Sequence, residues 1–145
     1  MKNDFYDEIN RKELAAKAVE ARKAAYAPYS GFMVGAALLT EEGKIYTGCN
    51  IENAAYTPCC CAERTAFFKA VSEGERHFRA IAIAGGSKEE KAAEFTAPCG
   101  VCRQVMMEFC NPEQFSVILC NAALETKTYT LSEMFPMGFG PGDLA

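Results

Sequence analysis

The sequence contains only one histidine, His77. Zinc centres that use two or three imidazole ligands are therefore excluded, because one histidine cannot supply them. A zinc site in this chain has to take most of its ligands from cysteine. We expect His77 itself to be a solvated residue between a helix and a strand, without a function.

A stripe of basic residues is also missing. The 15 Lys and Arg residues are outnumbered by 19 Asp and Glu residues, and the formal net charge at pH 7 is −4. Proteins that bind polynucleotides meet the phosphate backbone with clustered Lys and Arg side chains. We therefore expect no nucleic-acid partner.

Long apolar runs are absent as well. No segment approaches the roughly 20 apolar residues that a membrane-spanning helix needs. The opening stretch MKNDFYDEINRKEL lacks the apolar run of a signal peptide. These two absences favour a cytoplasmic protein with no membrane partner.

Cysteine, in contrast, is plentiful, with eight residues. In a reducing compartment, eight thiols indicate metal binding or small buried side chains rather than a disulfide framework. From their strand or helix contexts we assign Cys49, Cys110 and Cys120 to the core. The length of 145 residues and the apolar content of 50% suit one globular domain, residues 1–145.

Hydrophobic periodicity predicts an α/β protein. The expected helices cover residues 11–26, 61–71 and 99–109, and the expected strands cover residues 34–40, 45–49, 80–84, 115–120 and 126–130. Residues 85–96 form a charged loop with room for a short helical turn. Thr130-Leu131-Ser132-Glu133 has the form of a capping box, which predicts a short last helix.

The connector at residues 121–125 carries information on topology. Parallel strands need a crossover of about a dozen residues or more, and this connector is far shorter. The last two strands are therefore expected to form an antiparallel hairpin.

Two motifs fall at the starts of predicted helices: Cys61-Ala62-Glu63 and the CxxC of Pro98-Cys99-Gly100-Val101-Cys102. Free backbone N–H groups in a first helical turn stabilise thiolates. Three thiolates leave the fourth tetrahedral position of zinc open, which is the pattern of a catalytic rather than a structural site. Glu63 is suited to carry protons beside the metal, and Arg64 to offset the charge of the thiolates.

The arrangement of Cys61, Glu63 and the CxxC matches the zinc-deaminase pattern H-x-E followed by P-C-x-x-C, with Cys61 in place of the histidine. Further motifs are YSGFMVGAAL at 29–38, GCNIENAAY at 48–56, CAERTA at 61–66, PCGVCRQV at 98–105 and FPMGF at 135–139. Together, over residues 14–144, they resemble the cytidine and deoxycytidylate deaminase family, and within it the short homotetrameric zinc-dependent type.

The resemblance implies a three-layer fold, with helices on both faces of a five-stranded mixed sheet. It implies one Zn²⁺ per chain, held by Cys61, Cys99 and Cys102, and Glu63 as the catalytic proton carrier. The implied reaction is the hydrolytic deamination of cytidine and 2′-deoxycytidine to uridine and 2′-deoxyuridine, with release of ammonia, in pyrimidine salvage.

The resemblance also implies a set of substrate-binding residues. Asn50 and Glu52 resemble the pair that binds the ribose 3′-hydroxyl, and Phe32 resembles an aromatic wall for the base. Ala62 and Tyr56 are further substrate-binding positions. Phe139 resembles a residue supplied by a neighbouring subunit, so that each active site of a homotetramer lies at a subunit interface.

The sequence departs from the family pattern at three places. Cys59 and Cys60 stand where Thr or aliphatic residues are usual, Met33 replaces Pro, Arg or Lys, and Met137-Gly138 replaces a Gly-Ala pair. We expect Cys59 and Cys60 to be small packing residues or redox-sensitive bystanders. As a fourth ligand, either one would instead fit a non-catalytic zinc or redox module.

Two other deaminase functions remain as alternatives. One is action on a different aminopyrimidine nucleoside, such as a blasticidin-type antibiotic, against which Asn50-Ile51-Glu52-Asn53 favours a plain ribose. The other is polynucleotide editing, which the acidic composition and the predicted terminal hairpin disfavour.

Overall fold

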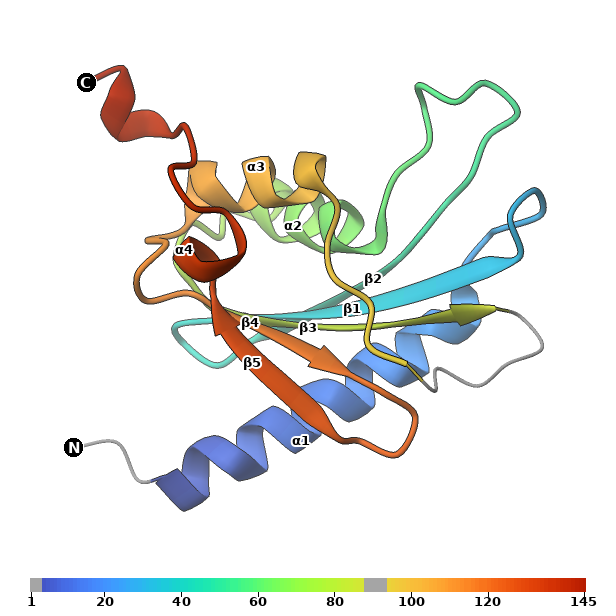
Figure 1. Ribbon diagram of the computed structural model, residues 1–145, viewed down its shortest axis with the longest axis horizontal. Helices are drawn as coiled ribbons and strands as arrows, with labels where there is room; N and C mark the ends of the chain where they lie inside the picture. The colour runs from blue at the N-terminus through green and yellow to red at the C-terminus, as the bar shows by residue number, and fades with distance from the viewer. Residues whose placement is uncertain (1–3, 88–93) are drawn as a thin grey trace.

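The computed structural model describes residues 4–87 and 94–145 and centres on a five-stranded sheet in the order β2-β1-β3-β4-β5 (Figure 1). The strands are β1 (Phe32–Thr40), β2 (Ile45–Cys49), β3 (Phe78–Ser87), β4 (Ser116–Cys120) and β5 (Thr126–Thr130). Only the β3–β4 pair is parallel; β1 pairs with β2 and β3, and β4 with β5, in antiparallel fashion. The predicted mixed sheet and terminal hairpin are both confirmed.

Helices cover both faces of this sheet. Helix α1 (Asp4–Ala21) lies across one face, and α2 (Ala62–Ser72) and α3 (Gly100–Phe109) lie side by side on the other (Figure 1). The alternation of side chains along a strand explains the division. Ile81 and Ile83 of β3 pack toward α2 and α3, whereas Ala82 packs toward α1. The predicted three layers are confirmed.

The first helix differs from its predicted range of 11–26. It begins at Asp4, ends at Ala21 and continues as the 3-10 turn η1 (Arg22–Ala24). Tertiary hydrogen bonds explain the early end. The Arg22 guanidinium donates from Nε to the carbonyl of Met33 at 2.8 Å, and the amide of Tyr26 donates to the carbonyl of Asn50 at 2.9 Å. Apolar periodicity does not reveal such long-range partners.

Strand β3 is longer than its apolar segment at 80–84. It runs to Ser87 because it pairs with β1 as far as Phe32. The helical turn expected within 85–96 falls largely on residues 88–93, outside the described residues.

The short last helix, α4 (Leu131–Met134), begins at the predicted capping box. The amide of Glu133 donates to Thr130 Oγ1 at 3.2 Å, and the amide of Thr130 donates to Glu133 Oε1 at 2.9 Å. A 3-10 turn, η2 (Pro141–Asp143), follows near the C-terminus. Among the helices of residues 4–87 and 94–145, none is long and apolar enough to cross a membrane.

Candidate active site

Three thiols gather where α2 and α3 begin. Cys61 and Cys99 are the N-cap residues of the two helices, with extended backbones, and Cys102 lies in the first turn of α3. The Sγ atoms of Cys61 and Cys99 are 3.7 Å apart, and those of Cys99 and Cys102 are 3.5 Å apart. The helix starts thus bring together three residues that lie up to 41 positions apart in the sequence.

The spacing of this thiol cluster suits zinc. Tetrahedral zinc with Zn–S bonds of about 2.3 Å places its sulfurs about 3.8 Å apart, and the three Sγ atoms all lie within 4.8 Å of one another. Within the part of the chain that the structure describes, it is the one group of three or more His, Cys, Asp or Glu side chains placed to hold a metal ion.

Cys59 and Cys60 are not part of the thiol cluster. Cys59 Sγ accepts a hydrogen bond from the amide of Asn53 at 3.2 Å, within the loop that precedes it. Cys60 Sγ accepts one from Thr65 Oγ1 at 3.6 Å. Neither thiol belongs to the group that is spaced for a metal. Of the other cysteines, Cys110 and Cys120 are buried as expected, and Cys49 is half-buried.

Arg64 lies against the thiol cluster. Its Nη2 donates to Cys61 Sγ at 3.4 Å, and its Nε is buried with no hydrogen-bond partner among the described residues. Hydrogen bonds from Cys102 and Arg64 lower the pKa of Cys61 to about 5. The same hydrogen bond to Cys61 raises the pKa of Cys102. Cys61 therefore holds the first negative charge of the cluster, and Arg64 is its counter-ion.

Glu63 is the buried carboxyl group of the site. It lies in the first turn of α2 and is only 4% exposed. Burial raises the pKa of Glu63, because a charged carboxylate is poorly solvated there. A raised pKa makes the carboxylate a better proton acceptor, so Glu63 is suited to take up a proton and to pass it on.

A cavity of about 340 Å³ opens beside Cys61, Glu63 and Cys99. Its lining contains four of the six residues expected to bind substrate: Phe32, Asn50, Glu52 and Ala62. The structure therefore brings these sequence-predicted residues into one hollow next to the thiol cluster.

Asn50 and Glu52 have structural partners in addition to their place in the cavity. Asn50 Oδ1 accepts from the amide of Val34, and its Nδ2 donates to the carbonyl of Phe32, both at 2.8 Å. Glu52 accepts from the amides of Tyr29 and Ser30 at 3.0 and 3.1 Å and from Ser30 Oγ at 2.5 Å. The hydrogen bonds from Ser30 lower the pKa of Glu52. These contacts fix the loop and strand that form one wall of the cavity.

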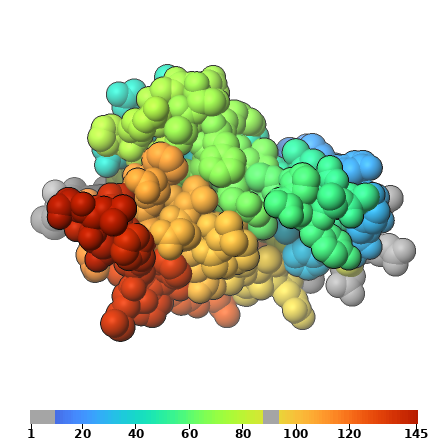
Figure 2. Space-filling view, turned by 90° about the horizontal axis from the view of Figure 1, so that it is seen from above, coloured from blue at the N-terminus to red at the C-terminus, as the bar shows by residue number. Residues whose placement is uncertain are grey.

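Tyr56 and Phe139 do not line this cavity. Tyr56 is 89% exposed and borders an adjacent hollow of about 280 Å³, which shares Ser30 and Glu52 with the first. Phe139 is 56% exposed, and its carbonyl accepts from Gln104 of α3 at 2.7 Å. Figure 2 shows the segment of residues 51–60 (green) and the C-terminal segment (red) at opposite ends of the face that α2 and α3 form.

Four further residues, which the sequence did not single out, also line the cavity: Ser30, Val34, Thr96 and Ala97. Ser30 and Val34 lie in a motif that carries the family resemblance, and Thr96 and Ala97 directly precede the PCGVC motif. Their position within or next to these motifs was the feature of the sequence that could have identified them as cavity residues.

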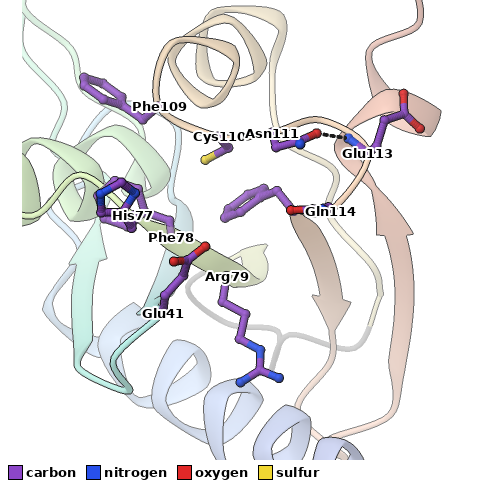
Figure 3. Close-up of a pocket in the computed structure, with 10 residues that line it drawn as sticks. Glu41, His77, Phe78, Arg79, Phe109, Cys110, Asn111, Glu113 and Gln114 are labelled. Atoms are coloured by element: carbon purple, nitrogen blue, oxygen red, sulfur yellow. Dashed lines mark hydrogen bonds between the residues drawn. The ribbon is translucent and has the colours of Figure 1, made fainter. Parts of the chain in front are cut away.

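Figure 3 shows the lining of a larger cavity, of about 720 Å³. Its lining mixes polar and aromatic side chains, among them Glu41, His77, Phe78 and Cys110. His77 is exposed here, as expected. None of the three clustered thiols lines this cavity, so it lacks the chemistry of the smaller one.

Comparison with known proteins agrees with this geometry. The model of the cytidine and deoxycytidylate deaminase zinc-binding region matches residues 9–118. A cytidine deaminase of Sporosarcina psychrophila is 48% identical over 134 residues, which cover 92% of this chain and 94% of the relative. One of Halalkalibacterium halodurans is 46% identical over 136 residues, or 94% of this chain and 98% of the relative.

A solved structure is similar to this chain over most of its length. The crystal structure of cytidine deaminase from Burkholderia pseudomallei aligns with a TM-score of 0.78 at 45% identity, and covers 88% of this chain and 97% of its own. The thiol cluster, the family model and relatives of nearly equal length lead to one conclusion. This chain belongs to the zinc-binding cytidine and deoxycytidylate deaminase family.

Proposed function

We propose that the protein hydrolyses the C4 amino group of cytidine and 2′-deoxycytidine in pyrimidine salvage, in the cytoplasm, and releases ammonia. The observation that carries the proposal is the buried Glu63 beside the clustered thiols at a nucleoside-sized hollow. Relatives named cytidine deaminase, at 48% and 46% identity, support the choice of substrate.

In this proposal, Cys61, Cys99 and Cys102 hold the zinc ion. When bound, zinc would supply a Lewis acid that lowers the pKa of a water molecule. Glu63 takes a proton from the attacking water and delivers it to N3 of the pyrimidine while the water oxygen bonds to C4. It then passes the second proton of that water to the amine, which leaves as ammonia as the C4–N bond breaks. Its burial supports this assignment, because the raised pKa favours proton uptake by the carboxylate.

Arg64 balances the charge of the proposed ligand set. Three thiolates are electron-rich and oppose ionisation of a nearby water. The hydrogen bond from Arg64 to Cys61 withdraws part of that charge. Arg64 is therefore a positioning and charge-compensating residue, without contact to the substrate.

Asn50 and Glu52 bind the ribose 3′-hydroxyl, and Phe32 and Ala62 border the base. A cavity of about 340 Å³ suits a small molecule, since such sites measure roughly 300–1,000 Å³. Its small size and the negative net charge favour a nucleoside over a polynucleotide.

We further propose a homotetramer in which each active site is completed by neighbouring chains. Large apolar side chains are exposed near the cavity, including Tyr29 (62%), Phe32 (41%) and Tyr56 (89%). Soluble monomers rarely expose large apolar patches, so these side chains favour burial against neighbouring chains. Tyr56 and Phe139, which do not line the cavity of their own chain, would then contact substrate in a neighbour.

Activity assays on purified, zinc-loaded protein test the proposal. We expect loss of absorbance with cytidine and 2′-deoxycytidine, much slower turnover of a blasticidin-type nucleoside, and none of single-stranded DNA. Glu63→Ala should retain one zinc per chain and lose activity by at least about a hundredfold. Fully active Glu63→Ala protein would refute the mechanism, and preferential turnover of the antibiotic or of DNA would refute the substrate assignment.

A further inference from the structure

Gly48, near the end of β2, packs directly against the backbone of α2. A Cβ atom at this position would lie 2.5 Å from the carbonyl oxygen of Ala62 and 2.6 Å from the amide nitrogen of Ala66. Real Cβ atoms essentially never come within 3.0 Å of such atoms. The missing side chain thus allows the first turns of α2 to rest on the strand, a close backbone approach that only glycine permits.

A second contact fixes the chain immediately before α2. Ile51 and Cys60 form an isolated antiparallel bridge, in which each amide donates to the other's carbonyl at 2.9 Å. Cys61 lies between this bridge and the glycine contact at Ala62. The segment from Gly48 to Ile51 therefore holds the start of α2 from both sides of Cys61.

This arrangement matters for the thiol cluster because its members come from two helices. Cys99 and Cys102 belong to the start of α3, whereas Cys61 alone belongs to the start of α2. The distance from Cys61 to the other two thiols therefore depends on where α2 rests on the sheet.

The displacement that a methyl group would cause can be bounded. Raising the contact with Ala62 from 2.5 to 3.0 Å requires a shift of at least 0.5 Å (3.0 − 2.5). Zinc ligand distances tolerate deviations of about 0.2 Å. A shift of α2 by that amount would move the Cys61 thiolate out of range of an ion held by α3.

We propose that Gly48 is a positioning residue for the zinc centre. Gly48 lets α2 rest on β2 without a side chain between them. Together with the Ile51–Cys60 bridge, this contact determines the position of the Cys61 thiolate. The inference rests on the zinc centre and is independent of which nucleoside is deaminated.

Gly35 of β1 offers a matched control. A Cβ atom there would clash with the carbonyl oxygen of Ala18 and the amide nitrogen of Arg22, which belong to α1 and η1. The substitution Gly35→Ala therefore forces a similar backbone clash, but against the helix on the opposite face, which supplies no thiol to the cluster.

Zinc affinity, rather than activity, is the decisive measurement. Competition with a chromophoric chelator gives the zinc dissociation constant, and thiolate-to-cobalt absorption bands of the Co²⁺-loaded protein report the ligand geometry. We expect Gly48→Ala to weaken zinc binding by about tenfold or more and to alter these bands. Gly35→Ala should lower the melting temperature but leave zinc affinity within about threefold of the parent. Parent-like zinc affinity in Gly48→Ala, or an equal loss in both variants, would overturn the proposal.

Should Gly48→Ala fail to fold, the bridge provides a second test. Ile51→Pro removes the amide that donates to Cys60, and Ile51→Ala keeps that amide while removing a side chain that is 46% exposed. We expect weaker zinc binding in Ile51→Pro only. Equal zinc affinity in the two variants would contradict the positioning role of this segment.

Discussion

The guanidinium of Arg64 donates a hydrogen bond to the sulfur of Cys61, three residues earlier and at the start of the same helix. Residues three apart are neighbours on a helix, so the spacing within the sequence CAER places the two side chains next to each other. The contact helps to lower the pKa of Cys61 and raises that of Arg64. The two charges therefore stabilise each other.

The first prediction concerns this pair. Arg64→Gln leaves a shorter, uncharged polar side chain that lacks the Nη2 donor to Cys61, so the thiolates become more electron-rich. We expect kcat to fall by about tenfold or more, and zinc to be retained less well in the presence of a chelator. Arg64→Lys should recover part of both properties, because it restores charge without the planar donor geometry. Parent-like zinc retention and activity in Arg64→Gln would rule out charge compensation.

The second prediction separates the three consecutive cysteines. Cys60→Ser and Cys59→Ser should each retain one zinc per chain, because these thiols face Thr65 and Asn53 rather than the cluster. Cys61→Ser should lose zinc. Metal analysis after dialysis against a mild chelator measures all three variants side by side. Zinc loss in Cys60→Ser would show that the metal takes a different set of ligands.

The sequence predicted β3 as a central strand because residues 80–84 are apolar throughout, and the terminal hairpin because the connector before β5 is short. The three layers followed from the family resemblance. The sequence also placed Cys61, Cys99 and Cys102 at helix starts, where the structure has them. Local motifs carry this information because N-caps, turns and capping boxes depend on a few neighbouring residues.

Other features depend on partners far away in the sequence. The end of α1 is set by bonds that Arg22 and Tyr26 make to β1 and to the chain after β2. The contacts of Asn50 and Glu52 with β1 and the Tyr29–Ser30 turn are likewise long-range. No periodicity or motif encodes such contacts, so the sequence could indicate roles for these residues but not their structural partners.

The third prediction concerns the capping box at the start of α4. Thr130→Ala removes the acceptor for the amide of Glu133, and loss of such an N-cap costs about 1 kcal/mol of the free energy of unfolding. Bonds from the backbone and side chain of Thr130 lower the pKa of Glu133. The stabilisation by the Glu133 charge is therefore present above the ordinary glutamate pKa, about 4.3, and is lost as the pH falls through the lower, folded-state value.

Thermal unfolding between pH 7 and pH 3 checks this expectation. Glu133→Gln should have a lower melting temperature than the parent at pH 7, and the difference should shrink as the pH falls. Glu42→Gln, in the exposed β1–β2 turn, serves as the control and should differ little from the parent at any pH. A difference for Glu133→Gln that stays constant down to pH 3 would contradict a charge-dependent cap.

The last prediction tests whether Glu52, held in place by the Tyr29–Ser30 turn, binds the ribose. Ser30→Ala removes the hydroxyl donor to Glu52 at 2.5 Å and leaves the two amide donors in place. Because the bonds from Ser30 lower the pKa of Glu52, the substitution should raise that pKa toward its ordinary value. Glu52 remains ionised at pH 7, but it protonates earlier as the pH falls. The KM for cytidine should therefore rise modestly at pH 7 and more steeply below about pH 5, with kcat and zinc content unchanged.

A substrate that lacks the 3′-hydroxyl separates recognition from folding. If Glu52 binds this hydroxyl, 3′-deoxycytidine should be a poor substrate for the parent protein, because it cannot make that hydrogen bond. Ser30→Ala should then narrow the difference in kcat/KM between cytidine and 3′-deoxycytidine, since it weakens the Glu52 contact that the analogue cannot make. The substitution also removes the acceptor of the Phe32 amide, a loss that affects both substrates alike. If instead the substitution lowers kcat/KM for both substrates by the same factor, Glu52 supports the cavity wall and does not read the ribose.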